Sequence, residues 1–248
     1  MENIKLIPLL FLSLTMASCD DLKQEVFIKK PTEKINPVIE ESTLQTYPLS
    51  IELPIINEPP KVFTFAEKLS HAALERTTHD ITYDGRYIKI AYPMGDVPDS
   101  IGVCTDVVIR SYREMGIDLQ QLLHEDIRKN FKRYPNQKRW GLSRPDTNID
   151  HRRVPNLRVF FSRHGESLPV TDDATDYLPG DLVTWKLNKN MVHIGIVSSE
   201  KSFNNPDRYL IIHNIGAGTE LSDMLFDYEI TGHYRYGFTQ DEEEEVNN

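Results

Sequence analysis

Cysteine is scarce in this chain, whose 248 residues include only Cys19 and Cys104. The sequence contains no C-x-x-C or H-x-x-x-H pair, which is the spacing typical of structural zinc sites. It also has no internal repeat, and its longest apolar stretch, residues 4–16, is shorter than the ~20 residues that a transmembrane helix needs. What remains is a chain of ordinary composition, with 39% hydrophobic residues, that suits one domain with flanking segments.

The N-terminal segment, MENIKLIPLLFLSLTMASC, has the pattern of an export signal. Lys5 lies near the start of the segment, and the small residues Ala17 and Ser18 come before Cys19. The tetrapeptide from Met16 to Cys19 resembles the lipobox of bacterial lipoproteins, which implies cleavage after residue 18 and a diacylglycerol on the Cys19 thiol. An ordinary cleaved signal with an incidental cysteine is the alternative. The lipobox predicts a protein of the bacterial cell envelope that is held to a membrane through its N-terminal lipid.

The segments that flank the expected domain differ from it in composition. Residues 29–60 hold six of the fifteen prolines and have almost no hydrophobic periodicity, which is typical of an extended linker. The C-terminal end contains DEEEE, a solvated acidic run. We therefore predict a signal peptide over residues 1–18, a lipid-anchored Pro-rich linker over 19–60, a folded domain over 61–238 and an acidic disordered tail over 239–248.

Helical patterns come first in the domain and strand patterns follow. Thr64 and Glu67 form a capping box before FAEKLSHAALERT, and Asp118 is a plausible cap for the next-but-one helix. Between them, apolar residues recur at helical spacing after Cys104 until Gly116. From residue 180 onward, GDLVTWKL, VHIGIVSS, YLIIHNIG and YEITGHYRYG are short β-branched or aromatic segments separated by turn residues. This order predicts an α+β fold in which the cysteine helix packs on an antiparallel sheet.

Cys104 is expected in the first turn of its helix, within GVCTDVVIRSYREMG. If Cys19 carries a lipid, Cys104 remains a free thiol in an exported protein. Such a thiol is either a small buried hydrophobic side chain or a group used in chemistry. A helix N-terminus and an imidazolium neighbour both lower the pKa of a thiol from about 8.5, which would favour a nucleophile.

Two histidines lie on adjacent predicted strands. Alternation in VHIGIVSS places His193 and Gly195 on one face, and the glycine leaves room for another backbone, such as a helix start. His213 in YLIIHNIG can then lie beside His193. Cys104, His193 and His213 would supply a nucleophile, a base and the group that orients the base. Three zinc ligands are the alternative, which the missing paired-ligand spacing disfavours.

The order of these motifs resembles that of the NlpC-type cysteine peptidases, whose fold is a circularly permuted papain-like one. The matching pieces are Tyr92-x-x-Gly95, Cys104 at a helix start, GD before a strand, HIG on the next strand and IIHN on the one after. The resemblance implies a papain-like α+β fold with Cys104 as nucleophile, His193 as base, His213 as orienting group and Tyr92 at the oxyanion site.

Longer segments resemble the bacterial domain of unknown function family numbered 1287 over most of residues 80–237. They include YDGRYIKIAYPMGDVPDSIGVCTDVVIR, NIDHRRVPNL and IHNIGAG. The better-known peptidases have D-C-S-G where this chain has V-C-T-D, which implies a different substrate rim beside the nucleophile.

Several polar residues near these motifs are candidates for substrate binding. Asp106 either pairs with Arg110, one helical turn away, or contacts a substrate amine or a loop. The segment DTNIDHRR has oxygen ligands at positions 146, 148 and 150, as at the start of a calcium loop, but the required glycine and closing glutamate are missing. We expect this segment to fix a long loop or to form one wall of the cleft. The expected substrate-binding residues are Asp106, Arg152, Arg153 and Asn214.

Basic residues are concentrated in one part of the chain. Eleven Lys or Arg stand against two Asp between residues 127 and 163, although the formal net charge of the whole chain is −10. A solvated surface would explain this run. An exported protein is not expected to bind nucleic acid, whereas arginine binds the carboxylates of peptidoglycan peptides, or another anionic envelope substrate, through two bonds.

These observations predict a cell-envelope cysteine hydrolase that needs no cofactor and no metal. It would cleave an amide bond, which location and resemblance place in a peptidoglycan stem peptide. A non-catalytic envelope-binding module on the same fold and an acyltransferase with the same triad are the alternatives. The sequence leaves the oligomeric state open.

Overall fold

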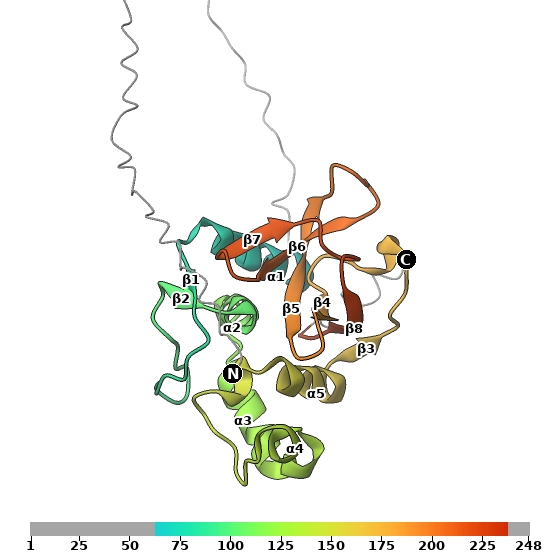
Figure 1. Ribbon diagram of the computed structural model, residues 1–248. Coiled ribbons are helices and arrows are strands. Elements are labelled where there is room, and N and C mark those ends of the chain that lie inside the picture. Colours follow the sequence, from blue (N-terminus) through green and yellow to red (C-terminus); the bar gives the residue numbers. More distant parts are fainter. Residues whose placement is uncertain (1–62, 238–248) are drawn as a thin grey trace, which may run out of the picture. The chain divides into compact units, whose positions relative to one another are not determined.

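The computed structural model describes residues 63–237, shown as coloured ribbon in Figure 1. The predicted signal peptide, the lipidation site Cys19, the linker and the acidic tail therefore lie outside the described residues. None of the helices within residues 63–237 has both the length and the apolar character needed to cross a bilayer.

The domain consists of helices followed by an antiparallel sheet, which confirms the predicted α+β class (Figure 1). The helices are α1 (Phe65–Glu75), α2 (Cys104–Glu114), α3 (Leu119–Asn130), α4 (Asn136–Trp140) and α5 (Val154–His164). Short 3₁₀ helices are η1 (Arg76–Thr78), η2 (Phe131–Arg133), η3 (Asp150–Arg152) and η4 (Ala174–Asp176).

Six strands form the main sheet in the order β3-β8-β4-β5-β6-β7, with every neighbouring pair antiparallel. Their bounds are β3 (Glu166–Leu168), β4 (Leu182–Lys186), β5 (Val192–Lys201), β6 (Tyr209–Asn214), β7 (Thr219–Ser222) and β8 (Glu229–Arg235). A separate parallel pair, β1 (Thr82–Tyr83) and β2 (Ile101–Gly102), ends directly before α2.

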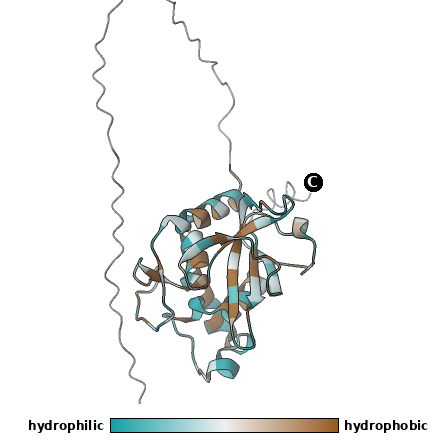
Figure 2. Cartoon of the chain, turned by 45° about the horizontal axis from the view of Figure 1, so that its top comes forward, coloured by the Kyte–Doolittle hydropathy of each residue, from teal (hydrophilic) through white to brown (hydrophobic). Residues whose placement is uncertain are grey.

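The two faces of the main sheet bury different sets of side chains. On the helix face, Ile194 and Ile196 of β5 pack with Val108 of α2 and Phe161 of α5. On the other face, Val197 joins a smaller cluster around Trp185. Figure 2 shows hydrophobic residues along the strands and hydrophilic ones on the peripheral loops. Strand alternation thus places Ile194 and Ile196 in one core and Val197 in the other, as the sequence pattern predicted.

The capping box at the start of α1 forms as predicted. Thr64 accepts a hydrogen bond from the backbone of Glu67 at 3.1 Å, and the Glu67 carboxylate accepts one from the backbone N–H of Thr64 at 3.0 Å. The helix packs against α2 and β5. Its first turn also meets the loop before β4, where Gly180 approaches Ala66.

Gly180→Ala is expected to lower the free energy of unfolding by about 3 kcal/mol. Gly180 has a φ of +87°, and an added Cβ would lie 2.9 Å from the Cα of Ala66, so backbone strain and a steric clash coincide. Gly116→Ala is the matched control, because its φ is +76° but an added Cβ meets no atom within 4 Å. The control should lose only about 1 kcal/mol in urea denaturation. Equal losses for both variants would show that the contact with α1 is unimportant.

Candidate active site

Cys104 is the first residue of α2. Val103 before it is extended, with a φ of −127°, and ends the turn that enters the helix. The Cys104 side chain is only 5% exposed and belongs to the core between the helices and the sheet. Burial raises the pKa of its thiol to about 12, which outweighs hydrogen bonding from the Ile194 backbone that lowers it. The expectation of a lowered pKa is therefore wrong for the resting structure, because desolvation exceeds the effect of the helix N-terminus.

The contact with Ile194 places the thiol at the β5 backbone, one residue from His193. The structure also brings the two candidate histidines together, since Nε2 of His193 lies 3.1 Å from Nδ1 of His213 on β6. The two rings are perpendicular, with centroids 5.0 Å apart. Burial lowers the pKa of His193 to about 3, with a further contribution from His213, and lowers the pKa of His213 to about 4. Both imidazoles are therefore neutral near pH 7.

A hydroxyl on β7 continues this chain of polar groups. Nε2 of His213 lies 2.6 Å from Oγ of Ser222 and 3.8 Å from a carboxylate oxygen of Glu220. In the tautomer in which Nε2 of His213 donates to Ser222, Nδ1 of His213 accepts the Nε2 proton of His193. In the same tautomer Nδ1 of His193 carries a lone pair, and no hydrogen bond to this nitrogen is found within residues 63–237. The hydrogen bonds that link β5, β6 and β7 through His193, His213 and Ser222 thus leave Nδ1 of His193 unbonded.

Gly195 leaves room for another backbone, as the sequence had suggested. That backbone is β6 and not the start of a helix, which was the expected example. An added Cβ would lie 2.7 Å from Cγ2 of Ile211 and 3.2 Å from Cβ of His213. The glycine therefore allows the His213 side chain to lie against β5, next to His193. Its role in the site is to set the distance between two strands at the point where the imidazoles meet.

Asp106 forms a buried ion pair with Arg152 of η3. Its two carboxylate oxygens accept from Nε and one terminal nitrogen of Arg152, each at 2.8 Å, and both side chains are under 5% exposed. The same carboxylate accepts the backbone N–H of Val103 at 2.7 Å. Arg110 instead pairs with Asp96 at 3.0 Å. The predicted surface pair between Asp106 and Arg110 is therefore wrong.

Arg152 also ties the segment before β2 to the helix start. It donates to the backbone carbonyls of Asp84 and Arg86, both at 3.3 Å. Burial opposes the charge of Arg152, but the hydrogen bonds and charge of Asp106 raise its pKa on balance. Asp106 and Arg152 are thus fully used within the protein, and the structure does not offer either of them to a substrate.

The other two expected substrate-binding residues also make internal contacts. Arg153 pairs with Asp150 at 3.0 Å, and its guanidinium lies 4.1 Å from the ring centroid of Trp140. Asn214 is fully buried at the end of β6, where it donates to the carbonyl of Gly102 at 3.5 Å. This bond connects the strand of His213 to the residue pair before Cys104. Both side chains therefore act in positioning the local backbone.

The structure does not bring Tyr92 to the thiol. Its ring packs on His124 of α3, with centroids 5.0 Å apart, and the neighbouring Met94 donates to Asp118 at the start of α3. This position is near the C-terminal end of α2, whereas Cys104 is at the N-terminal end of that helix. The Tyr-x-x-Gly motif thus has a structural role in joining the loop after Tyr92 to α3.

Tyr83 is the tyrosine near the thiol, and sequence reasoning missed it. Burial raises the pKa of its phenol, and the charges of Cys104 and Asp106 raise it further. Its side chain is 44% exposed, so it connects the buried thiol to the surface. The parallel pairing of β1 with β2 places Tyr83 opposite Gly102. A two-residue strand leaves no periodic pattern in the sequence, so no signal indicated this position.

The calcium-like segment fixes a loop, as one of the sequence interpretations proposed. Asp146 accepts from the Tyr87 hydroxyl at 3.1 Å, and Asn148 accepts from the backbone of Ile90 at 2.9 Å. Over residues 63–237, no three His, Cys, Asp or Glu side chains gather in a way that could hold a metal ion. The oxygens of this segment bind protein N–H and O–H groups.

Asp106→Asn is expected to lower the free energy of unfolding by roughly 3–5 kcal/mol, because it leaves the Arg152 charge buried without a partner. Urea denaturation would measure the loss. Asp99→Asn, at an exposed position in the same part of the chain, should change stability by less than about 0.5 kcal/mol. The double variant Asp106→Leu with Arg152→Met should lose less than Asp106→Asn, since it buries no lone charge. A single variant as stable as the parent protein would contradict this account of the helix start.

Comparison with known proteins identifies relatives of the domain. The model of the domain of unknown function family DUF1287 matches residues 70–236. The chain is 48% identical over 168 residues to the "Uncharacterized protein YijF" of Escherichia coli (strain K12), and the alignment covers 68% of this chain and 80% of that protein. No solved structure matches. Because the family model spans more than half of the chain, including Cys104, His193 and His213, the protein belongs to the DUF1287 family.

Proposed function

We propose that this domain is a papain-like cysteine hydrolase in which Cys104 is the nucleophile and His193 the general base. The observation that carries the proposal is the 3.1 Å contact of Nε2 of His193 with His213, which leaves Nδ1 of His193 as a free base. A nucleophile at a helix start, a base on the adjacent strand and a third group that orients the base are the parts that thiol catalysis needs.

The resting thiol and imidazole are both neutral, so the reaction begins with proton transfer. Nδ1 of His193 accepts the proton of Cys104 as the sulfur attacks an amide carbonyl, and a carbon–sulfur bond forms. The carbon–nitrogen bond then breaks, and His193 returns the proton to the leaving amine. Water, activated by His193, attacks the thioester, releases a carboxylic acid and restores the thiol. Displacement of water by substrate would strengthen each of these interactions.

The oxyanion of the tetrahedral intermediate needs donors near the start of α2. The backbone N–H of Cys104 is at the N-terminus of an 11-residue helix, where unpaired donors and the helix dipole favour negative charge. The phenol of Tyr83 is the second candidate donor, in the role that the family resemblance gave to Tyr92. Its raised pKa keeps it protonated near neutral pH, as a donor must be.

The proposed papain-like fold and the proposed substrate both rest on the order in which the cysteine helix and the two histidine strands follow one another along the chain. A helix that begins with cysteine packs on β5 and β6, and these strands carry the histidines in the order that NlpC-type peptidases have. By that resemblance, the bond is an amide in a peptidoglycan stem peptide. The lipobox pattern at residues 16–19 supports lipid anchoring in the cell envelope. Acyl transfer to an amine would use the same groups and differ only in the acceptor.

One observation favours a second candidate, a non-catalytic binding module. Cys104 is 5% exposed and its thiol has a pKa of about 12, so it also fits a small core side chain. In that case the two histidines would serve only to connect β5, β6 and β7. Turnover by the variants described next separates the two functions.

Cys104→Ala is expected to abolish release of peptide fragments from purified peptidoglycan, a loss of at least about a thousandfold, measured by mass spectrometry. His193→Ala should be equally inactive. His213→Asn should lose only about tenfold, because an amide oxygen can still accept from Nε2 of His193. The melting temperature of Cys104→Ala should fall by only a few degrees. Full activity in His193→Ala would overturn the base assignment, and equal peptidoglycan binding without turnover would favour the binding module.

Alkylation by iodoacetamide tests the resting state in a Cys19→Ser chain, where Cys104 is the only thiol. Because burial raises the pKa to about 12, the folded protein should react more than about a hundredfold more slowly at pH 8.5 than the protein in urea. The rate should still rise with pH above 9. His193→Ala should leave this profile unchanged, since a neutral imidazole adds no charge. A folded thiol that titrates below about 8.5 would show a preformed ion pair instead.

A further inference from the structure

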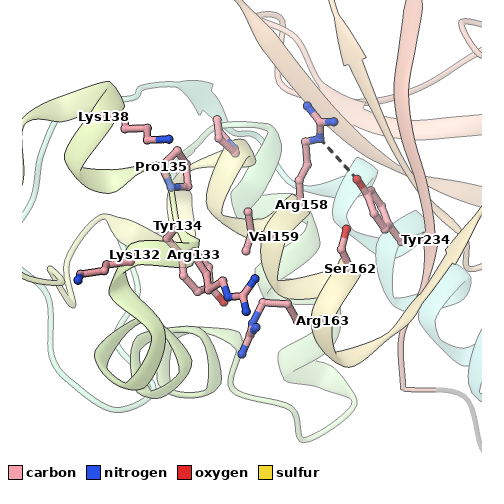
Figure 3. Close-up of a pocket in the computed structure, with 11 residues that line it drawn as sticks. Lys132, Arg133, Tyr134, Pro135, Lys138, Arg158, Val159, Ser162, Arg163 and Tyr234 are labelled. Carbon is pink, nitrogen blue, oxygen red and sulfur yellow. Dashed lines mark hydrogen bonds between the residues drawn. The ribbon is translucent and has the colours of Figure 1, made fainter.

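A cavity of about 530 Å³ lies between α5, β8 and the segment that joins α3 to α4 (Figure 3). Figure 3 shows Arg133, Arg158 and Arg163 extending into this space, with Lys132 and Lys138 on the side of η2 and α4. We call it the basic cavity. Its lining also contains the hydroxyl groups of Tyr234 and Ser162 and no Asp or Glu, while the hydroxyl of Tyr134 donates to Asp126.

Four of the five cations that line the basic cavity have no carboxylate partner within residues 63–237. Arg163 is the exception, because it is held by both oxygens of Asp126 at 2.7 and 3.0 Å. Arg158 donates to the carbonyl of Thr231 at 2.6 Å and to the hydroxyl of Tyr234 at 3.4 Å, which fixes its guanidinium but leaves its charge uncompensated. Lys132, Arg133 and Lys138 are exposed and bind no acidic group.

Like charges gathered around one cavity repel one another, and a bound anion relieves that repulsion. Five cationic side chains line the cavity although the whole chain has a formal net charge of −10. Folding therefore gathers residues from η2, α4 and α5 into one positive concavity. A surface that served only for solubility would intersperse both signs of charge.

The basic cavity is separate from the candidate active site. Tyr234 of β8 is paired with Leu182 of β4, which is paired with Ile196 of β5, so two strand spacings of about 4.8 Å separate Tyr234 from β5. The residues that line the cavity do not include Cys104, His193 or His213.

We infer that the basic cavity binds a ligand with two or more phosphate groups. Four uncompensated charges within about 530 Å³ call for a ligand of high charge density. A phosphate group carries close to two negative charges at pH 7 and three acceptor oxygens. A carboxylate carries only one negative charge and two acceptor oxygens. Arginine binds phosphate oxygens through two parallel bonds, and the fixed guanidinium of Arg158 is suited to this. The inference does not depend on the proposed thiol chemistry.

Isothermal titration calorimetry of the full chain with sodium pyrophosphate, at constant ionic strength, tests the inference. Saturable binding at a one-to-one ratio is expected. Arg133→Gln with Lys138→Gln should weaken the affinity at least tenfold, and it removes exposed side chains that the fold does not use. Lys89→Gln with Lys189→Gln is the matched control, because both lysines are exposed and lie outside the cavity. The control should change the affinity by less than twofold.

Three results would overturn the inference. They are the absence of saturable heat, equal weakening in the control variant, and citrate binding as tight as that of pyrophosphate, which would show that the cavity does not select phosphate. Titration of Cys104→Ala separates this proposal from the hydrolase proposal. Unchanged pyrophosphate binding in that variant would support a site independent of the thiol, and lost binding would contradict the separation of the two sites.

Discussion

The buried ion pair of Asp106 and Arg152 is the interaction on which the candidate active site depends. It joins the first turn of α2 to η3, and through two backbone carbonyls it also holds the segment between β1 and β2. Two charges removed from water are costly unless every hydrogen-bonding position is satisfied, and here the carboxylate also accepts the Val103 N–H. The position and direction of Cys104 follow from this arrangement.

The hydrogen-bonded chain of His193, His213 and Ser222 is also buried, but it differs from the Asp106–Arg152 pair because its members are uncharged. Instead of pairing charges, it keeps neutral groups in one orientation through hydrogen bonds across β5, β6 and β7. Desolvation raises the pKa of the thiol and lowers those of the imidazoles, so the resting site holds no ion pair. The proposed chemistry of such a site starts when a substrate carbonyl approaches the sulfur.

The basic residues of the middle segment serve two purposes that a count of charges cannot separate. Arg152 and Arg153 turn inward and bind Asp106 and Asp150, where they hold loops in place. Lys132, Arg133 and Lys138 line the basic cavity with Arg158 and Arg163. From the sequence, this run fitted either a solvated surface or a site that binds carboxylates. The fold divides it, because η3 lies at the start of α2 and α5 faces β8.

The sequence by itself determined the features that depend on neighbouring residues. The capping box of α1, Cys104 as the first residue of α2, the α+β order and the two faces of β5 all follow from local periodicity and caps. Only the tertiary structure decided which distant groups meet. The charge of Cys104 acts on the phenol pKa of Tyr83, whereas Tyr92 packs on His124. Asp106 pairs with Arg152 and not with Arg110, and burial reversed the expected shift of the Cys104 pKa. These outcomes depend on long-range contacts and on desolvation, which spacing along the chain does not encode.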